Sequence, residues 1–82
     1  MLHIEFHIFA QSDRIVFANR LRTILREYGQ KDYNISTHGT QVVLTIANLY
    51  SYAIGFPLIN SIEEMRVKHQ ISGYLASLEY RS

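Results

Sequence analysis

The chain has 82 residues, of which 48% are hydrophobic and 18% charged, with a formal net charge of +1 and no cysteine. This length leaves room for a single domain, residues 1–82, with one small core. The absence of cysteine excludes disulfides, thiolate metal sites and a cysteine nucleophile, and the near-zero net charge excludes a general electrostatic attraction to nucleic acid.

The first residues predict a β-strand. From residue 2 to residue 10 every even position is apolar, and alternation with a period of two is typical of a strand that buries one face. The even positions are Leu2, Ile4, Phe6, Ile8 and Ala10. Because no basic stretch precedes a continuous apolar run, we expect no secretory signal and a cytoplasmic location.

A helix is expected next, capped by Ser12 or Asp13 and ended by Gly29. Apolar residues recur between these positions at helical spacing, which predicts a face that packs on the core. They are Phe17, Ala18, Leu21, Ile24, Leu25 and Tyr28.

The same helix carries Arg20, Arg22 and Arg26, which form a candidate nucleic-acid surface. Arg22 and Arg26 are one helical turn apart, a spacing that can contact successive phosphates or an acidic partner. A solvated helix face is the simpler interpretation of these arginines.

Residues 33–46 predict a β-hairpin in which His38 and Gly39 form the two-residue turn. This register pairs Thr37 with Thr40 and places apolar residues on one face, namely Tyr33, Ile35, Val42, Leu44 and Ile46. The other face is mostly polar, as expected of an open sheet face, and comprises Asn34, Ser36, Gln41, Val43 and Thr45.

The C-terminal third allows two predictions. In the first, a helix covers about residues 58–72, with Pro57 in its first turn, Ser61 and Glu64 at capping-box spacing, and Gly73 as its terminator. Its inward side would carry Leu58, Ile62, Met65 and His69. A last strand would follow, with inward residues Tyr74, Ala76, Leu78 and Tyr80.

In the second prediction one long helix continues through Gly73. The first is favoured, because glycine in a helix interior costs roughly 1 kcal/mol.

The favoured element order is strand, helix, strand, strand, helix, strand, which resembles that of ferredoxin-like domains. We therefore predict an α+β fold in which an antiparallel four-stranded sheet is backed by two helices. The alternative is a β-α-β-β unit followed by one long C-terminal helix. This likeness concerns the fold alone, because such folds host many unrelated functions.

His3, Glu5 and His7 are a candidate metal or ligand site. On one strand the Cα atoms of His3 and His7 lie about 13 Å apart, too far for both rings to reach a zinc ion at roughly 2.0–2.1 Å. Such a site would need a residue from a neighbouring strand, for which Glu79 is the candidate. A solvated strand face without a cofactor is the favoured interpretation.

From Tyr33 to Ile62 the chain contains no Asp, Glu, Lys or Arg. A domain this small cannot bury all of these residues, and interface cores are depleted in charge and rich in aromatic anchors. We therefore expect a partner-binding surface around Tyr50, Tyr52 and Phe56. A membrane span is not expected, because polar residues and helix breakers interrupt the apolar run: Thr45, Asn48, Ser51, Gly55 and Pro57.

No catalytic motif is present, since the glycines are isolated and no serine lies in a nucleophile motif, so we expect no enzymatic activity. The leading hypothesis is an interaction or regulatory module that forms a dimer, or that docks on or inhibits a partner protein. The alternatives are a nucleic-acid-binding regulator and a metal- or small-ligand-binding domain.

The predicted sheet does not resemble the RNA-binding surface of RNA-recognition domains. The sheet of those domains exposes several aromatic residues, whereas here only Phe9 is expected on the open face.

Overall fold

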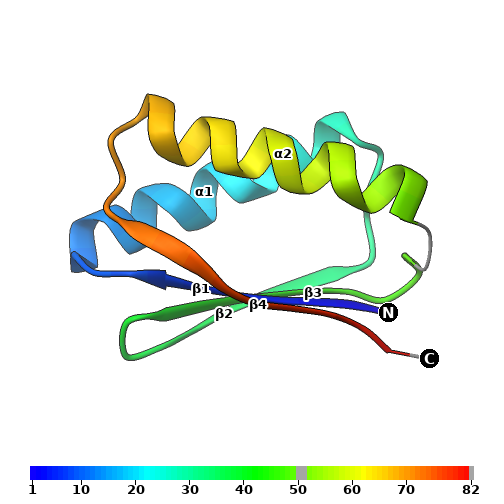
Figure 1. The fold of residues 1–82 in the computed structure, drawn as a ribbon, viewed down its shortest axis with the longest axis horizontal. Helices are drawn as coiled ribbons and strands as arrows, with labels where there is room; N and C mark the ends of the chain where they lie inside the picture. The colour runs from blue at the N-terminus through cyan, green and yellow to red at the C-terminus, as the bar shows by residue number, and fades with distance from the viewer. Residues whose placement is uncertain (50–51, 82) are drawn as a thin grey trace.

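The computed structural model describes residues 1–49 and 52–81, and for residues 52–54 it describes the backbone alone. These residues form a four-stranded antiparallel sheet and two helices (Figure 1). The elements are β1 (Leu2–Ile8), α1 (Gln11–Glu27), β2 (Tyr33–His38), β3 (Gln41–Ile46), α2 (Tyr52–Lys68) and β4 (Gly73–Tyr80). The sheet order is β2-β3-β1-β4. The predicted α+β class and element order are confirmed, and the alternative with one long C-terminal helix is wrong.

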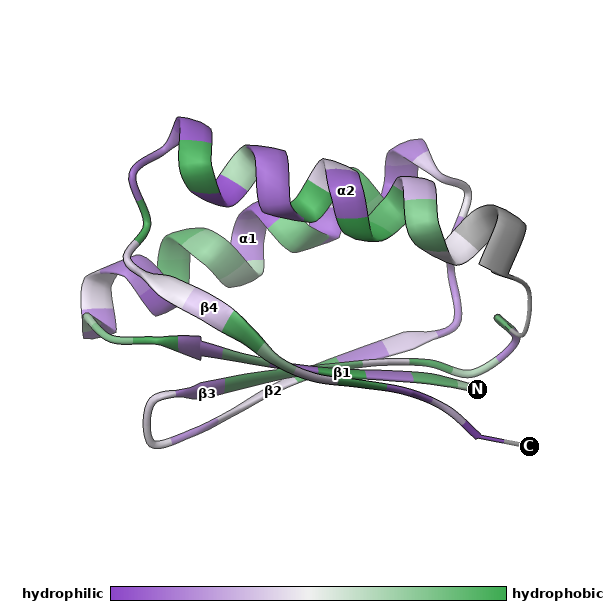
Figure 2. Cartoon of the chain, in the orientation of Figure 1, coloured by the Kyte–Doolittle hydropathy of each residue, from purple (hydrophilic) through white to green (hydrophobic). Residues whose placement is uncertain are grey.

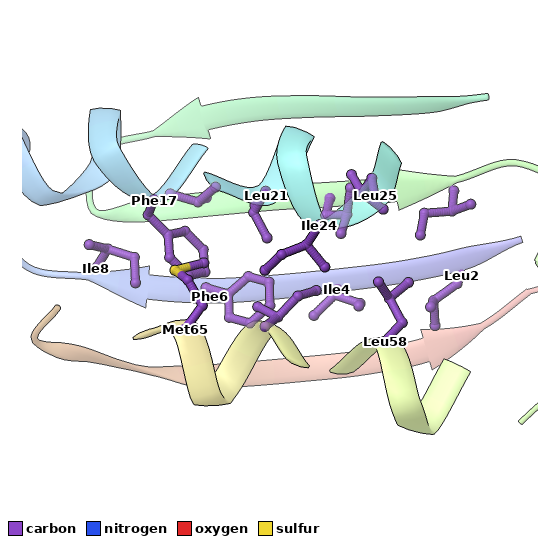
Figure 3. Packing of buried hydrophobic residues seen from close by; sticks show 14 of the residues in the cluster. Leu2, Ile4, Phe6, Ile8, Phe17, Leu21, Ile24, Leu25, Leu58 and Met65 are labelled. Atoms are coloured by element: carbon purple, nitrogen blue, oxygen red, sulfur yellow. The ribbon is translucent and has the colours of Figure 1, made fainter. Parts of the chain in front are cut away.

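Both helices lie on the same side of the sheet (Figure 1), and among the described residues no helix covers the other side. In both helices apolar and polar stretches alternate (Figure 2), as expected where one face is buried. Figure 3 shows the core between the layers, where α1 lies over the β2–β3 half of the sheet and α2 over the β1–β4 half. Phe6 and Phe17 pack edge to face there, with ring centroids 5.0 Å apart.

The alternation in β1 sorts its side chains as predicted. Leu2, Ile4, Phe6 and Ile8 are fully buried, whereas the odd positions between them are half-buried on the open face of the sheet. Ala10 is an exception to the prediction, since the strand ends at Ile8 and Ala10 is exposed.

The end of α1 was predicted correctly and its beginning was not. Ala10 occupies the N-cap position without a side-chain cap, so Ser12 and Asp13 lie inside the first turn. At the other end Gly29 has φ +70, and the amides of Gly29 and Gln30 donate to the carbonyls of Arg26 and Leu25. This is the paired hydrogen-bond pattern of a Schellman motif.

The predicted hairpin exists, but its register is shifted by two residues. His38 pairs with Gln41, so the turn residues are Gly39 and Thr40 rather than His38 and Gly39. Gly39 has φ +61, so the turn places its glycine first and spares His38 a left-handed conformation. A shift of two preserves the faces, and the strand residues of β3 predicted to face inward are buried.

The second helix begins six residues earlier than predicted. It starts at Tyr52, so Pro57 lies inside the helix and Ser61 and Glu64 form no capping box. Leu58, Ile62 and Met65 are buried as predicted, whereas His69 is exposed beyond the helix end.

The helix α2 ends without help from Gly73. Gln70 has φ +55, and the amides of Gln70 and Ile71 donate to the carbonyls of Val67 and Arg66. The pattern is again a Schellman motif, here with glutamine in the left-handed position and the buried Ile71 as the apolar residue that follows. Gly73 instead begins β4, where an added Cβ would collide with the backbone oxygen of His7.

A β-bulge interrupts β4. Glu5 pairs with Ser77 but Phe6 pairs with Leu75, so Ala76 is an extra residue without a partner on β1. Leu75 and Leu78 both pack against the core as a result. The predicted inward placement is therefore wrong for Tyr74 and Ala76, which are exposed, and right for Leu78 and Tyr80.

The ends of β1 and β4 lie side by side (Figure 1). The amino group of Met1 donates to the carbonyl of Arg81 at 2.6 Å, and the amide of Arg81 donates to the carbonyl of Met1 at 2.7 Å. These two hydrogen bonds close the pairing of the strands at this edge of the molecule.

Candidate functional site

His3, Glu5 and His7 all lie on the open face of the sheet, but only two of them meet. His3 Nε2 lies 3.2 Å from Glu5 Oε1, and the hydroxyl of Ser77 donates to Glu5 Oε2 at 3.2 Å. His3 Nδ1 also lies 3.4 Å from the hydroxyl of Thr45 on β3. The carboxylate of Glu5 is therefore held by β1 and β4 together.

The hydrogen bond from His3 is the main cause that lowers the pKa of Glu5, and the hydroxyl of Ser77 adds to it. Glu79 pairs with His3 across the strands, as a shared site would require. However, its carboxylate accepts a 2.7 Å hydrogen bond from Arg81, which is also the main cause that lowers the pKa of Glu79. Within the described residues, no group of three or more His, Asp or Glu side chains is placed to hold a metal ion.

His7 belongs to a separate aromatic cluster. Its ring stacks on Tyr74 with centroids 5.1 Å apart, and Phe9 lies 6.0 Å from the same tyrosine. Tyr74 and Phe9 are both exposed. The bulge at Ala76 turns Tyr74 to this face, so the open face offers one more aromatic residue than predicted.

The spacing of the leucines in β4 is the sequence signal for this cluster. Leu75 and Leu78 are three positions apart, so an unbroken strand cannot bury both. A bulge with one extra residue between Leu75 and Leu78 lets both leucines face the core. The strand residues before the bulge, including Tyr74, then lie on the opposite face from the one that strict alternation predicts.

The arginines of α1 do not form one surface. Arg22 lines a groove of about 370 Å³ between α1 and the β2–β3 hairpin, together with Arg14, Ile15 and Thr37. We call this the hairpin groove. Arg20 lines a different groove of about 290 Å³, between α1 and α2.

Within the hairpin groove Arg14 has a structural role, because its guanidinium donates to the carbonyls of Ile8 and Phe9 at 2.8 and 3.1 Å. Arg22 donates to the side chain of Asn19 at 3.1 Å and is exposed. Arg26, four residues further on, is exposed on the same flank of the helix. Among the residues that line this groove there is no carboxylate, so its charge is positive.

The groove between the helices is mixed in charge. It holds Arg20 and Lys68 with Glu27 and Glu64, and His69 at its end. Desolvation is the main cause that lowers the pKa of His69, and the positive charges of Arg20 and Lys68 lower it further.

Of the three aromatic residues predicted to anchor a partner, Tyr50, Tyr52 and Phe56, the structure describes the side chain of Phe56 alone. Tyr50 lies outside the described residues, and the side chain of Tyr52, the first residue of α2, does too. Phe56 lies on α2 and 56% of it is exposed. No helix in the described part of the chain is long and apolar enough to cross a membrane.

The same uncharged region supplies β2, which lies at one edge of the sheet. The carbonyl of Asp32 accepts a hydrogen bond from the amide of Ala47, so the even-numbered residues of this segment point their backbone groups at β3. Tyr33, Ile35 and Thr37 then point their N–H and C=O groups away from the sheet. We call these outward groups the β2 edge.

The two edges of the sheet differ in how they are protected. The edge formed by β4 is interrupted by the bulge at Ala76 and carries the ion pair of Glu79 with Arg81. Between Tyr33 and His38 no residue is charged. Bulges and charges are the usual means by which proteins block strand addition, and the β2 edge has neither.

Comparisons of this chain with protein-family models, with curated proteins and with solved structures find no match.

Proposed function

We propose that the chain is a non-enzymatic protein-interaction module that docks on its partner through the β2 edge. The observation that carries this proposal is the contrast between the two sheet edges: β4 is bulged and charged, whereas β2 has an unbroken register and no charged residue. An added strand would pair with the outward groups of Tyr33, Ile35 and Thr37, which is the recognition mode called β-augmentation. The edge belongs to the uncharged region for which the sequence predicts a partner.

The strand order β2-β3-β1-β4 and the helices on one face also support a ferredoxin-like arrangement. In that arrangement the second strand is an edge strand, which is why an uncharged sequence at this position is available to a partner.

The test is site-specific photocrosslinking in the source organism. A photoreactive amino acid at Thr37, which is exposed on β2, should capture a protein whose crosslinked peptide is identified by mass spectrometry. The same group at Ala76, exposed on β4, is the matched control and should capture nothing. Equal capture at both positions would contradict docking through β2.

The captured partner is then purified and its affinity measured. Thr37→Pro removes one outward N–H and leaves the β2–β3 hydrogen bonds in place, so affinity should fall at least about tenfold. Thr37→Ala keeps that N–H and should bind like the wild type.

A further inference from the structure

We infer that the occupant of the β2 edge is an extended segment of a partner protein with acidic side chains at alternating positions. The inference rests on the proposed function, and it adds the chemistry of the partner. Three observations carry it: the open backbone groups of β2, the positive hairpin groove beside them, and the spacing of two arginines on α1.

The backbone groups of the β2 edge select a polypeptide. Tyr33, Ile35 and Thr37 each offer a donor and an acceptor along the strand, and a second strand presents the complementary pattern. A nucleic acid has phosphate and base groups but no such ladder. The arginines of α1 alone would suit either partner, so the edge strand decides between them.

The hairpin groove selects the charge of that polypeptide. An added strand would lie roughly 4.8 Å outside β2, beneath the flank of α1 that carries Arg22 and Arg26. Among the charged groups around this position, Arg14 is held by backbone carbonyls, and the negative charge of Asp32, which accepts a hydrogen bond from Asn48 at 3.1 Å, is offset by the adjacent exposed Lys31. The net charge that a partner would meet beside β2 is therefore positive, from Arg22 and Arg26.

The spacing of the arginines selects the pattern of acidic residues. Arg22 and Arg26 are four residues apart, which is about 6 Å along a helix. Side chains on one face of a strand are two residues apart, which is about 6.6 Å. Two acidic residues of the added strand that are separated by one residue therefore have nearly the same spacing as Arg22 and Arg26, so each carboxylate can face one guanidinium group.

A second copy of this chain fits less well. If two β2 strands paired around a twofold axis, each hairpin groove would face its counterpart, and Arg22 and Arg26 would face arginines of the other copy. Facing arginines repel each other and oppose association of two copies. The strand β2 has no acidic residue that could pair with the arginines of the other copy.

The probe is a fluorescent synthetic peptide in which Glu alternates with Thr, and binding is followed by fluorescence anisotropy. On binding, the amides of Tyr33, Ile35 and Thr37 should gain protection from hydrogen exchange. A peptide with Lys in place of Glu should not bind. Absence of binding by the Glu peptide, or protection elsewhere than on β2, would overturn the inference.

Charge variants locate the contact. Arg22→Glu combined with Arg26→Glu should weaken binding of the Glu peptide at least about tenfold. Arg20→Glu combined with Lys68→Glu changes the net charge equally but in the groove between the helices, and should change affinity less than about twofold. Equal losses in both double variants would mean unspecific attraction and would contradict the inference.

Two further outcomes separate the competing occupants. Tighter binding of single-stranded oligouridylate than of the Glu peptide, with a steep dependence on salt, would favour nucleic acid and overturn the inference. A dimer in light scattering that Thr37→Pro dissociates would favour a second copy instead. If photocrosslinking at Thr37 captures a partner segment without acidic residues, the inference fails while the proposed function stands.

Discussion

His7 and Tyr74 stack on the open face of the sheet, with ring centroids 5.1 Å apart and ring planes at 30°. The two residues are opposite each other on β1 and β4. Their contact exists because Ala76 is bulged, since without the extra residue Tyr74 would point at the helices.

Replacing Tyr74 tests what this stack contributes. Tyr74→Ala should lower the free energy of unfolding by about 1 kcal/mol, the range of an aromatic pair at the surface. Loss of the ring current should also shift the ring-proton resonances of His7. Val67→Ala is the control for the resonances, because Val67 is exposed on α2 and its replacement should leave the ring protons of His7 unshifted. Unchanged His7 resonances in Tyr74→Ala would contradict the stacked geometry.

The two helix ends provide a pair of opposite substitutions. Gln70 has φ +55, a conformation that glycine adopts without strain, so Gln70→Gly should stabilise the protein by about 0.5–1 kcal/mol. Gly29 has φ +70 with open space around its Cα, so Gly29→Ala should destabilise it by about 1 kcal/mol through the backbone alone. Urea denaturation measures both. Shifts of the same sign would contradict this account of the helix ends.

Gly73 and Gly55 both lie where a Cβ would meet another residue, but the obstacles differ. At Gly73 the obstacle is the backbone oxygen of His7, which cannot move without breaking the pairing of β1 with β4. At Gly55 it is the hydroxyl at the end of the Tyr80 side chain. Gly73→Ala should therefore lower the free energy of unfolding by about 2–3 kcal/mol, and Gly55→Ala by less.

A double-mutant cycle checks the second contact. Tyr80→Phe removes the obstructing hydroxyl, so Gly55→Ala should be less damaging in the Tyr80→Phe background than in the wild type. Additive effects of the two substitutions would show that Gly55 and Tyr80 are not in contact.

Acid should weaken the fold through Glu5. Its pKa is lowered in the folded state, from a usual value of 4.5, by the hydrogen bond with His3. The stabilisation from Glu5 is therefore present above that usual value, and it is lost as the pH falls through the lower pKa of the folded state. Glu5→Gln should reduce the difference in unfolding free energy between neutral and acidic pH.

The control for this measurement is Glu64→Gln, which neutralises an exposed carboxylate on α2. It should leave the pH dependence close to that of the wild type. A pH dependence in Glu5→Gln identical to that of the wild type would show that the hydrogen bond with His3 does not stabilise the fold.

The elements that sequence could predict are those in which one periodicity holds throughout. In β1 the period of two is unbroken, and in α1 the apolar face from Phe17 to Leu25 is continuous, so both were predicted with their buried residues. In β4 the period breaks at Ala76, and an argument from strict alternation then assigns Tyr74 to the wrong face. The start of α2 does not follow from the sequence pattern, because proline is best tolerated in a first turn, whereas Pro57 lies inside the helix.

The candidate site was harder to predict than the fold, because it depends on the register between strands. The predicted element order already implies that β4 lies beside β1 and that β2 is an edge strand, but no local pattern encodes the register that places Ser77 opposite Glu5. The separation of Arg20 from Arg22, in contrast, can be predicted from the sequence. Two residues along a helix differ by about 200° in direction, so the sequence alone already places these two arginines on different flanks.

The hydrogen bonds between Met1 and Arg81 bring the two ends of the described chain together at the β4 side of the sheet. A short flexible linker could join them, and new ends could be opened at the exposed turn of Gly39 and Thr40. Such a circular permutant would keep every strand pairing while separating β2 from β3 in sequence. Affinity tags at the two ends of the described chain, in turn, would lie beside β1 and β4, away from β2, so they leave the docking edge accessible in all the binding experiments.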